Sequence, residues 1–280
     1  MPTTEAILKK YQGMKSLPQV AIRLNQLIAD PNSTMKQFEE IIRLDPTLVL
    51  RLLQLVNSSY FALRQKVESI SRAVALVGMK NLNNLIVISA VKDVFEEGAN
   101  EDIFSRVDLW LHCAAVSICA KMISERVLRK RGEDAHLCGI LHDIGMIIEE
   151  QVAPDLFYDA CESYLEGSGS FTEHETEIIG TNHCDLGYAI AQEWSLPEEV
   201  QTGIRDHHNV GNGESPETLS GMIQISDYIV SRLKYPAMHG MRQELSPDLA
   251  QYVRDKAAEF KVLVKSIPNE MTEAKEIYGI

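Results

Sequence analysis

Apolar residues along most of this chain recur at the three- and four-residue spacing of a helix that buries one face. A clear example is the set Leu48, Leu52, Leu55 and Val56. Typical helix-capping residues precede several such stretches. We expect helix starts at Thr34 with Gln37, Asp45-Pro46, Thr172 with Glu175, Ser195 with Glu198, and Ser246-Pro247-Asp248. The pattern predicts about a dozen helices of roughly 8–20 residues.

Strand patterns are nearly absent. The one β-like run is residues 85–88, and we interpret it as a buried helix segment because helical spacing surrounds it. Glycine-containing polar stretches at 97–100, 166–170 and 210–214 predict breaks between helices. The first break would divide an N-terminal helical part from the rest. The sequence therefore predicts an all-α protein.

Composition describes an ordinary globular chain. Of the 280 residues, 45% are hydrophobic, which is enough to bury a sizeable core. The sequence contains no apolar run of the roughly 18 residues needed to span a bilayer, and its first residues lack the order of a signal peptide. We therefore expect a cytoplasmic location and no transmembrane segment. The five cysteines contain no CxxC pair and are expected to be buried free thiols.

The net charge of −13 is unevenly distributed. Residues 132–204 contain sixteen Asp or Glu and no Lys or Arg, whereas residues 1–100 contain twelve Lys or Arg and nine Asp or Glu. Nucleic-acid binding needs a basic stripe, so no nucleic-acid partner is expected. A phosphate-bearing substrate in the acidic region would need a metal ion to offset the charge. The alternative is a solvated acidic face.

Candidate chemistry concentrates in the histidines, seven of which lie between positions 112 and 208. The segment GILHDIG, residues 139–145, places His142 and Asp143 side by side between apolar residues. An imidazole and a carboxylate are suitable ligands for Fe, Mn, Ni or Zn. Further ligand-type residues with apolar or helix-end surroundings are His112, His183, His207, His208 and Asp227.

Burying these imidazoles and carboxylates without partners would be costly. A metal ion could compensate for that cost, and so could mutual hydrogen bonding in a metal-free polar cluster. Spacing does not decide between the two. His136, His174 and His239 have polar or loop-like surroundings and are expected at the surface.

These residues resemble the HD superfamily, which is marked by a first His, a His-Asp pair and a last Asp. In this chain the matching residues are His112, His142, Asp143 and Asp227. The related HD-GYP proteins have additional histidine ligands and cleave cyclic di-GMP. His183, His207 and His208 look like those additions. The resemblance thus implies one or two divalent ions.

Motifs along the chain resemble the HDOD branch more closely. They are Leu17-Pro18, IIRLDPTL at 41–48, LVNSSY at 55–60, SISRAV at 69–74, LVG at 76–78, Trp110-Leu111-His112, GILHDIG, WSLP at 194–197 and His207-His208. The resemblance covers roughly residues 15–235. It implies a multi-helix HD-domain-like bundle with an N-terminal helical subdomain. The expected divisions are 1–98 for that subdomain, 99–235 for the HD-like core and 236–280 for C-terminal helices.

The resemblance implies a bacterial-type signal-transduction output module that is non-catalytic, has a protein partner and could bind metal. The alternative is a metal-dependent phosphohydrolase acting on a nucleotide or cyclic dinucleotide, with Asp143 as its catalytic residue. Two departures weaken the alternative. Met146 stands where active HD-GYP relatives have a lysine that would stabilise phosphate charge. No GYP follows His207-His208.

Overall fold

The computed structural model describes residues 4–12, 19–44, 46–57, 65–96, 103–209, 211, 213–241 and 243–274. Within these ranges the chain forms sixteen α-helices and one π-helical segment, with no strand. The all-α prediction is confirmed. There are more helices than the dozen expected.

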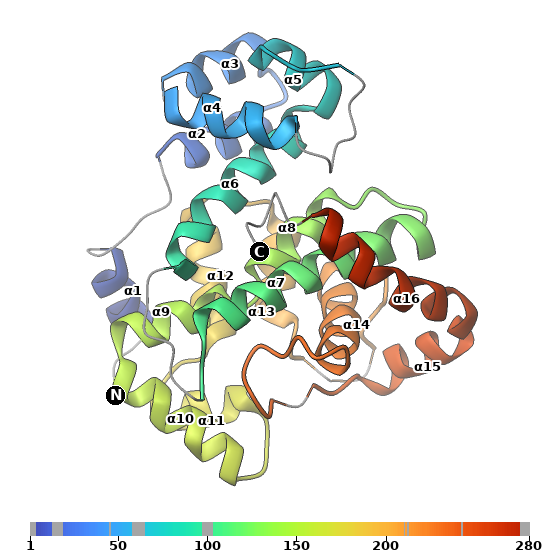
Figure 1. Cartoon of the computed structure of the whole chain (residues 1–280). Coiled ribbons are helices and arrows are strands. Elements are labelled where there is room, and N and C mark those ends of the chain that lie inside the picture. Colours follow the sequence, from blue (N-terminus) through green and yellow to red (C-terminus); the bar gives the residue numbers. More distant parts are fainter. Residues whose placement is uncertain are drawn as a thin grey trace.

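The N-terminal helices form a separate layer at one end of the molecule (Figure 1). The layer consists of α2 (Gln19–Ala29), α3 (Met35–Arg43), α4 (Pro46–Val56) and α5 (Ile70–Val77). The long helix α6 (Met79–Glu96) packs against α2, α4 and α5 and also against helices of the larger part. It therefore connects the two parts. The β-like run at 85–88 lies in α6 and is buried, as predicted.

The larger part is built around α7 (Arg106–Met122), which is buried along most of its length. Its neighbours include α8 (Glu133–Leu141) and α14 (Leu219–Arg232). α9 (Ile144–Val152) packs against α12 (His183–Glu193), and α12 packs against α13 (Glu198–Asp206). These helices bring together the segments that carry most of the histidines.

The remaining helices cover this core. α1 (Thr4–Gln12) packs on α9 and α12, although it precedes the N-terminal layer in sequence. α10 (Pro154–Glu166) and α11 (Phe171–Ile178) form a pair beside α9. α15 (Pro247–Asp255) and α16 (Ala257–Glu273) complete the fold, with α16 lying against α7 and the π-helical segment η2 (Ile123–Val127).

Two of the predicted helix starts were right. Thr34 and Gln37 form the expected capping box, and Ser246 caps α15. Asp45, Leu17-Pro18, residues 58–60 and the break at 97–100 lie outside the described residues. Pro46 begins α4 as expected.

Two predicted starts were wrong. α11 is capped by Ser170 with Glu173, not by Thr172 with Glu175, because the Glu175 side chain is fully buried and faces the core. α13 begins after Pro197, and Ser195 has the left-handed φ of 54° of a tight turn. In α11 the capping box lies two residues before the predicted one, whereas no side chain caps α13.

The domain boundaries expected at residues 98 and 235 remain a prediction. Described contacts do join α6 to α8. The Lys80 ammonium lies 2.6 Å from the Asp134 carboxylate, and the Asn84 amide donates to the Glu133 carbonyl at 3.0 Å.

Among the residues that the structure describes, one helical stretch is long and apolar enough to cross a membrane by length and composition. It is residues 106–127, and 78% of its apolar window is buried among the other helices, as in the core helix of a globular fold. α5 and α6 pass the same test only together, and they are bent by 109° at their junction.

Candidate metal centre

The His-Asp pair forms the short turn between α8 and α9. His142 ends α8 in helical conformation, and Asp143 stands at the N-cap position of α9. An N-cap aspartate usually accepts a hydrogen bond from its own helix. Asp143 makes no such bond, so its carboxylate is free to face the interior.

Two glycines of GILHDIG allow close helix contacts that assemble the centre. A Cβ on Gly139 would lie 2.5 Å from Cα of Ser117 in α7, and one on Gly145 would lie 2.0 Å from the carbonyl oxygen of His183 in α12. Backbone atoms cannot yield to such contacts. Glycine therefore lets α8 approach α7, and α9 approach α12.

A first group of donors contains His112 of α7, His142 and Asp227 of α14. Nε2 of His112 lies 3.3 Å from Nε2 of His142 and 3.4 Å from Oδ1 of Asp227. All three side chains are buried. Donor atoms this close can share one ion, because metal bonds to nitrogen and oxygen are about 2.0–2.2 Å long.

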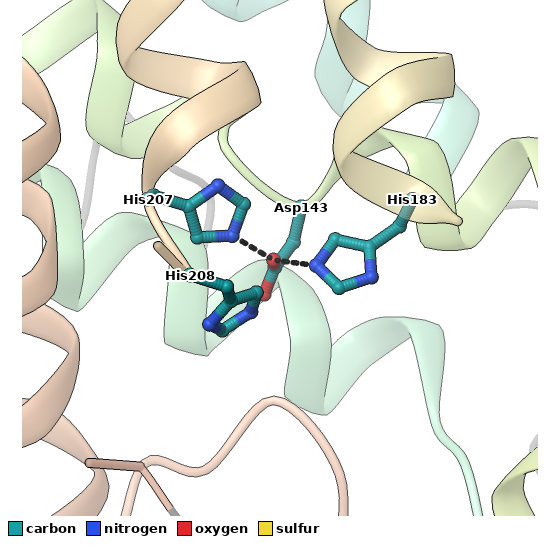
Figure 2. Close-up of side chains that lie close together, drawn as sticks. All are labelled: Asp143, His183, His207 and His208. Atoms are coloured by element: carbon teal, nitrogen blue, oxygen red, sulfur yellow. Dashed lines mark ion pairs between the residues drawn. The ribbon is translucent and has the colours of Figure 1, made fainter. Parts of the chain in front are cut away.

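A second group contains Asp143, His183, His207 and His208 (Figure 2). His183 opens α12, and the other two histidines directly follow α13. Oδ1 of Asp143 lies 3.5 Å from Nε2 of His183 and 3.3 Å from Nε2 of His207. The rings of His183 and His207 approach the carboxylate from opposite sides (Figure 2). His208 is half-buried and lies at the edge of the group.

Asp143 joins the two groups. Its Oδ2 lies 3.1 Å from Nε2 of His142 and 3.5 Å from Nε2 of His112, whereas Oδ1 faces His183 and His207. Both oxygens are buried and have no hydrogen-bond partner in the described part of the chain. The structure thus brings all seven residues singled out in the sequence to one place, in two groups with a shared carboxylate.

Four of these imidazoles are held from behind by hydrogen-bond acceptors. An acceptor requires the proton on Nδ1, so the neutral ring presents its Nε2 lone pair to the centre. The acceptors are the carbonyl of Tyr235 for His112 (2.7 Å), of Gly139 for His142 (2.8 Å) and of Ile204 for His207 (2.6 Å), and the Glu175 carboxylate for His183 (2.7 Å).

Burial and charge set the protonation of the centre. Burial lowers the pKa of His112 and that of His207 to about 4, so both rings are neutral at pH 7. Burial also disfavours charge on His142 and Asp143, but their mutual attraction outweighs it. The pKa of His142 is raised well above its usual value, and that of Asp143 is held well below.

The donor set fits a divalent ion. Imidazole and carboxylate donors suit Fe, Mn, Ni or Zn. A buried polar atom without a partner costs free energy, and such atoms occur together on Asp143, His207 and His208. One cation on each side of Asp143 would satisfy them.

Two buried acids near the centre were missed from the sequence. Glu149 of α9 and Glu175 of α11 are fully buried, and Glu175 contacts His183. Burial raises the pKa of Glu175 to about 8, and burial together with Glu175 raises that of Glu149 well above its usual value. A sequence signal existed for Glu149, which follows the apolar run at 144–148. Glu175 was interpreted as a cap.

The other histidines differ from the surface prediction in part. His239 is exposed as expected. His174 is half-buried, with Nδ1 2.9 Å from the Ser163 hydroxyl. His136 is buried, with Nδ1 3.4 Å from the Ser117 hydroxyl, because it faces α7 from α8. The five cysteines are buried and free, as predicted.

A cavity of about 740 Å³ lies beside the centre. Its wall includes His208, the loop 167–170 with the start of α11, and residues 240–241 and 243–244. His208 is thus shared by the cavity and the second donor group. Met146 is fully buried in α9 and brings no charge to this region.

A buried set of a first His, a His-Asp pair and a last Asp within a helical bundle defines an HD-type protein. The family model of the HDOD domain matches residues 14–210, so this chain belongs to the HDOD family. The resemblance noted from the motifs is confirmed.

Several solved structures have the same fold. A protein from Shewanella amazonensis, provisionally named a phosphohydrolase, covers 98% of this chain and 97% of its own, with a TM-score of 0.72 and 24% identity. An HDOD domain protein of unknown function from Geobacter sulfurreducens covers 98% and 95%, with a TM-score of 0.67 and 22% identity. A protein from Marinobacter aquaeolei, provisionally named a signal transduction protein, covers 96% and 61%, with a TM-score of 0.75 and 21% identity.

Two curated relatives match by sequence. An uncharacterised protein of Treponema pallidum is 28% identical over 222 residues, which are 78% of this chain and 42% of that protein. An uncharacterised protein of Bacillus subtilis is 37% identical over 76 residues, which are 27% of this chain and 18% of that protein. The chain thus spans less than half the length of the curated relatives it matches.

Proposed function

We propose that this chain is a metal-binding HDOD signal-transduction module whose centre holds two divalent ions bridged by Asp143. The observation that carries the proposal is the Asp143 carboxylate. It is 1% exposed, both oxygens lack a hydrogen-bond partner, and they face two separate groups of histidines. His112, His142 and Asp227 would hold one ion, and His183, His207 and His208 the other.

A non-catalytic role agrees with the charges around the centre. Phosphoryl chemistry is helped by cationic groups aimed at the developing charge. The segment 132–204 contains no Lys or Arg, and Met146 is buried at the position where active relatives have lysine. In this role the ions hold the fold around the centre, and the helical surface binds a protein partner in a signalling pathway.

Metal analysis of protein purified without chelator or added metal tests the proposal. We expect about two divalent ions per chain, in keeping with two donor groups that share one carboxylate. The variant Asp143→Asn should lose both. The matched control is Asp185→Asn, an exposed residue at the start of α12, which should keep both ions. Metal-free wild-type protein, or full occupancy in the Asp143→Asn variant, would contradict the proposal.

A second candidate is a metal-dependent phosphohydrolase acting on a nucleotide or cyclic dinucleotide. The cavity beside His208 favours it, because this cavity gives a small molecule room next to the second donor group. A bound ion there would supply a Lewis acid for a phosphoryl oxygen. Asp143 would then be catalytic through the ions it holds.

Turnover of cyclic di-GMP and of bis(p-nitrophenyl) phosphate by metal-loaded protein tests this candidate. Sustained hydrolysis that disappears in the His142→Ala variant would support it and displace the non-catalytic role. A rate equal to that of the variant, in protein shown to contain metal, would exclude it for these substrates.

A further inference from the structure

Glu175 contacts the imidazole nitrogen of His183 that points away from Asp143. It differs from the groups that contact the other histidine ligands in the same way. Nδ1 of His183 lies 2.8 Å from Oε1 and 2.7 Å from Oε2 of Glu175, and the backbone N–H of His183 lies 3.4 Å from Oε2. His112, His142 and His207 are instead backed by backbone carbonyls. The one carboxylate thus stands behind the second donor group.

Glu149 supports Glu175 from α9. Both side chains are 0% exposed, and a hydrogen bond between them helps to raise the pKa of Glu149 and to lower that of Glu175. No Lys or Arg occurs between positions 132 and 204 to neutralise the two acids. Burial without a cation raises the pKa of both acids, so the pair holds at least one proton near pH 7.

His183 is held in one orientation. The Phe171 ring, also at the start of α11, stacks on its imidazole with ring centres 5.9 Å apart and an interplanar angle of 26°. Glu175 fixes the proton on Nδ1, which leaves Nε2 facing Oδ1 of Asp143 at 3.5 Å. A carboxylate behind a histidine also makes Nε2 a stronger donor to a metal.

We infer that Glu175, supported by Glu149, is the positioning residue that fixes the tautomer of His183 and gives the second ion its affinity. This inference rests on the proposed two-ion centre. Loss of such a second-layer contact weakens metal binding by about 10–100-fold. The effect should be confined to the second ion, because the first group has its own backbone acceptors.

The test compares Glu175→Leu, which removes the acceptor, with Glu175→Gln, which keeps an acceptor oxygen but cannot ionise. Glu177→Gln, exposed on the same helix, is the matched control. Competition titrations with Zn²⁺ give both dissociation constants. We expect Glu175→Leu to weaken the second ion about 10–100-fold with the first within about twofold, Glu175→Gln to lie between, and the control to match wild type.

Imidazole ¹H–¹⁵N NMR of metal-free protein reads the tautomer directly, with the His183 signals assigned from a His183→Gln variant. Wild type and Glu175→Gln should carry the proton on Nδ1, and Glu175→Leu should lose that preference. Equal weakening of both ions would reduce Glu175 to a structural residue and overturn the inference. An unchanged tautomer in Glu175→Leu would also overturn it.

If Glu175→Leu does not fold, the near-isosteric Glu175→Gln decides through its effect on the second ion relative to the first. Equal constants to wild type would then overturn the inference. Wild-type protein that binds no metal would contradict the proposed function alone. The NMR result on metal-free protein would still decide whether Glu175 sets the tautomer.

Discussion

The side-chain amide of Asn25 donates a hydrogen bond to the backbone carbonyl of Trp194 at 2.9 Å, across 169 residues of sequence. Asn83 of α6 donates in turn to the Asn25 amide oxygen at 2.5 Å. Both asparagine side chains are buried. Trp194 ends α12, the helix that His183 opens. A buried chain of amides thus ties the N-terminal layer to a helix of the metal centre.

Replacing Asn25 with alanine should lower the free energy of unfolding by about 1–3 kcal/mol, because the Trp194 carbonyl and the Asn83 amide lose their partner inside the protein. Urea unfolding measures the change. The control Asn32→Ala removes an exposed amide of the same layer and should change stability by less than about 0.5 kcal/mol. Equal effects of the two substitutions would show that the buried amide chain contributes nothing.

Gly145→Ala should destabilise the protein by at least about 1–3 kcal/mol and weaken metal binding at the second group. The added Cβ would lie 2.0 Å from the His183 carbonyl oxygen, so α9 and α12 must move apart. Thermal unfolding and metal titration measure the two effects. In the control Gly132→Ala the nearest atoms, at 2.7 Å and beyond, belong to the flexible Lys121 and Glu125 side chains. A stable Gly145→Ala variant with normal metal binding would refute the proposed role of this close contact.

The buried ion pair of Arg106 and Glu150 joins α7 to α9, and both side chains are under 10% exposed. Removing one partner leaves an unpaired buried charge, so Arg106→Met should cost about 3–5 kcal/mol. The double variant Arg106→Met, Glu150→Leu should recover much of that loss. The exposed pair of Lys130 and Glu217, 2.8 Å apart, should contribute less than about 1 kcal/mol. Urea unfolding of the wild type, the two single variants and the double variant of each pair gives the coupling free energy that distinguishes the two pairs.

His136 should make stability depend on pH. Burial, followed by the charge of Lys121, lowers its pKa to about 3, whereas the unfolded chain has a pKa of about 6.5. The contribution is fully present above pH 6.5 and is lost as pH falls, because only the unfolded chain takes up the proton. The free energy of unfolding that His136 alone contributes should be about 1.4 kcal/mol lower at pH 5.5 than at pH 8.

The variant His136→Asn should show a smaller loss of stability between pH 8 and pH 5.5, whatever its stability at pH 8. Chemical unfolding at both pH values measures it. The exposed His239→Asn variant should keep the wild-type pH dependence. A His136→Asn variant with the same pH dependence as wild type would place the titrating group elsewhere.

Local patterns in the sequence predicted the helices well, because the spacing of apolar residues reports directly which face of a helix is buried. They placed two helix starts wrongly. Thr172 and Glu175 have the spacing of a capping box, but so do Ser170 and Glu173, and only the packing of α11 on the core decides which glutamate is exposed.

The candidate ligands were found from the sequence because imidazole and carboxylate side chains are typical metal ligands, and several of them lie in apolar segments or at helix ends. The arrangement of these ligands around Asp143 could not be found in this way. Whether Asp143 bridges two groups depends on contacts between five segments of the chain that are separated in sequence. The same holds for Glu175, which lies behind His183 only in the folded chain. His136 did have a sign of burial in its apolar neighbours Ala135 and Leu137, which the surface prediction overlooked.

The donors of the two groups come from α7, the turn between α8 and α9, α12, the end of α13, and α14. An unfolded chain cannot assemble such a set, so an ion would bind the native state alone. Under the proposed two-ion centre, native stability then follows mass action and gains about 2.7 kcal/mol when free metal is one hundred times the dissociation constant. The lifetime of the folded protein in the cell would therefore depend on the concentration of that free metal ion.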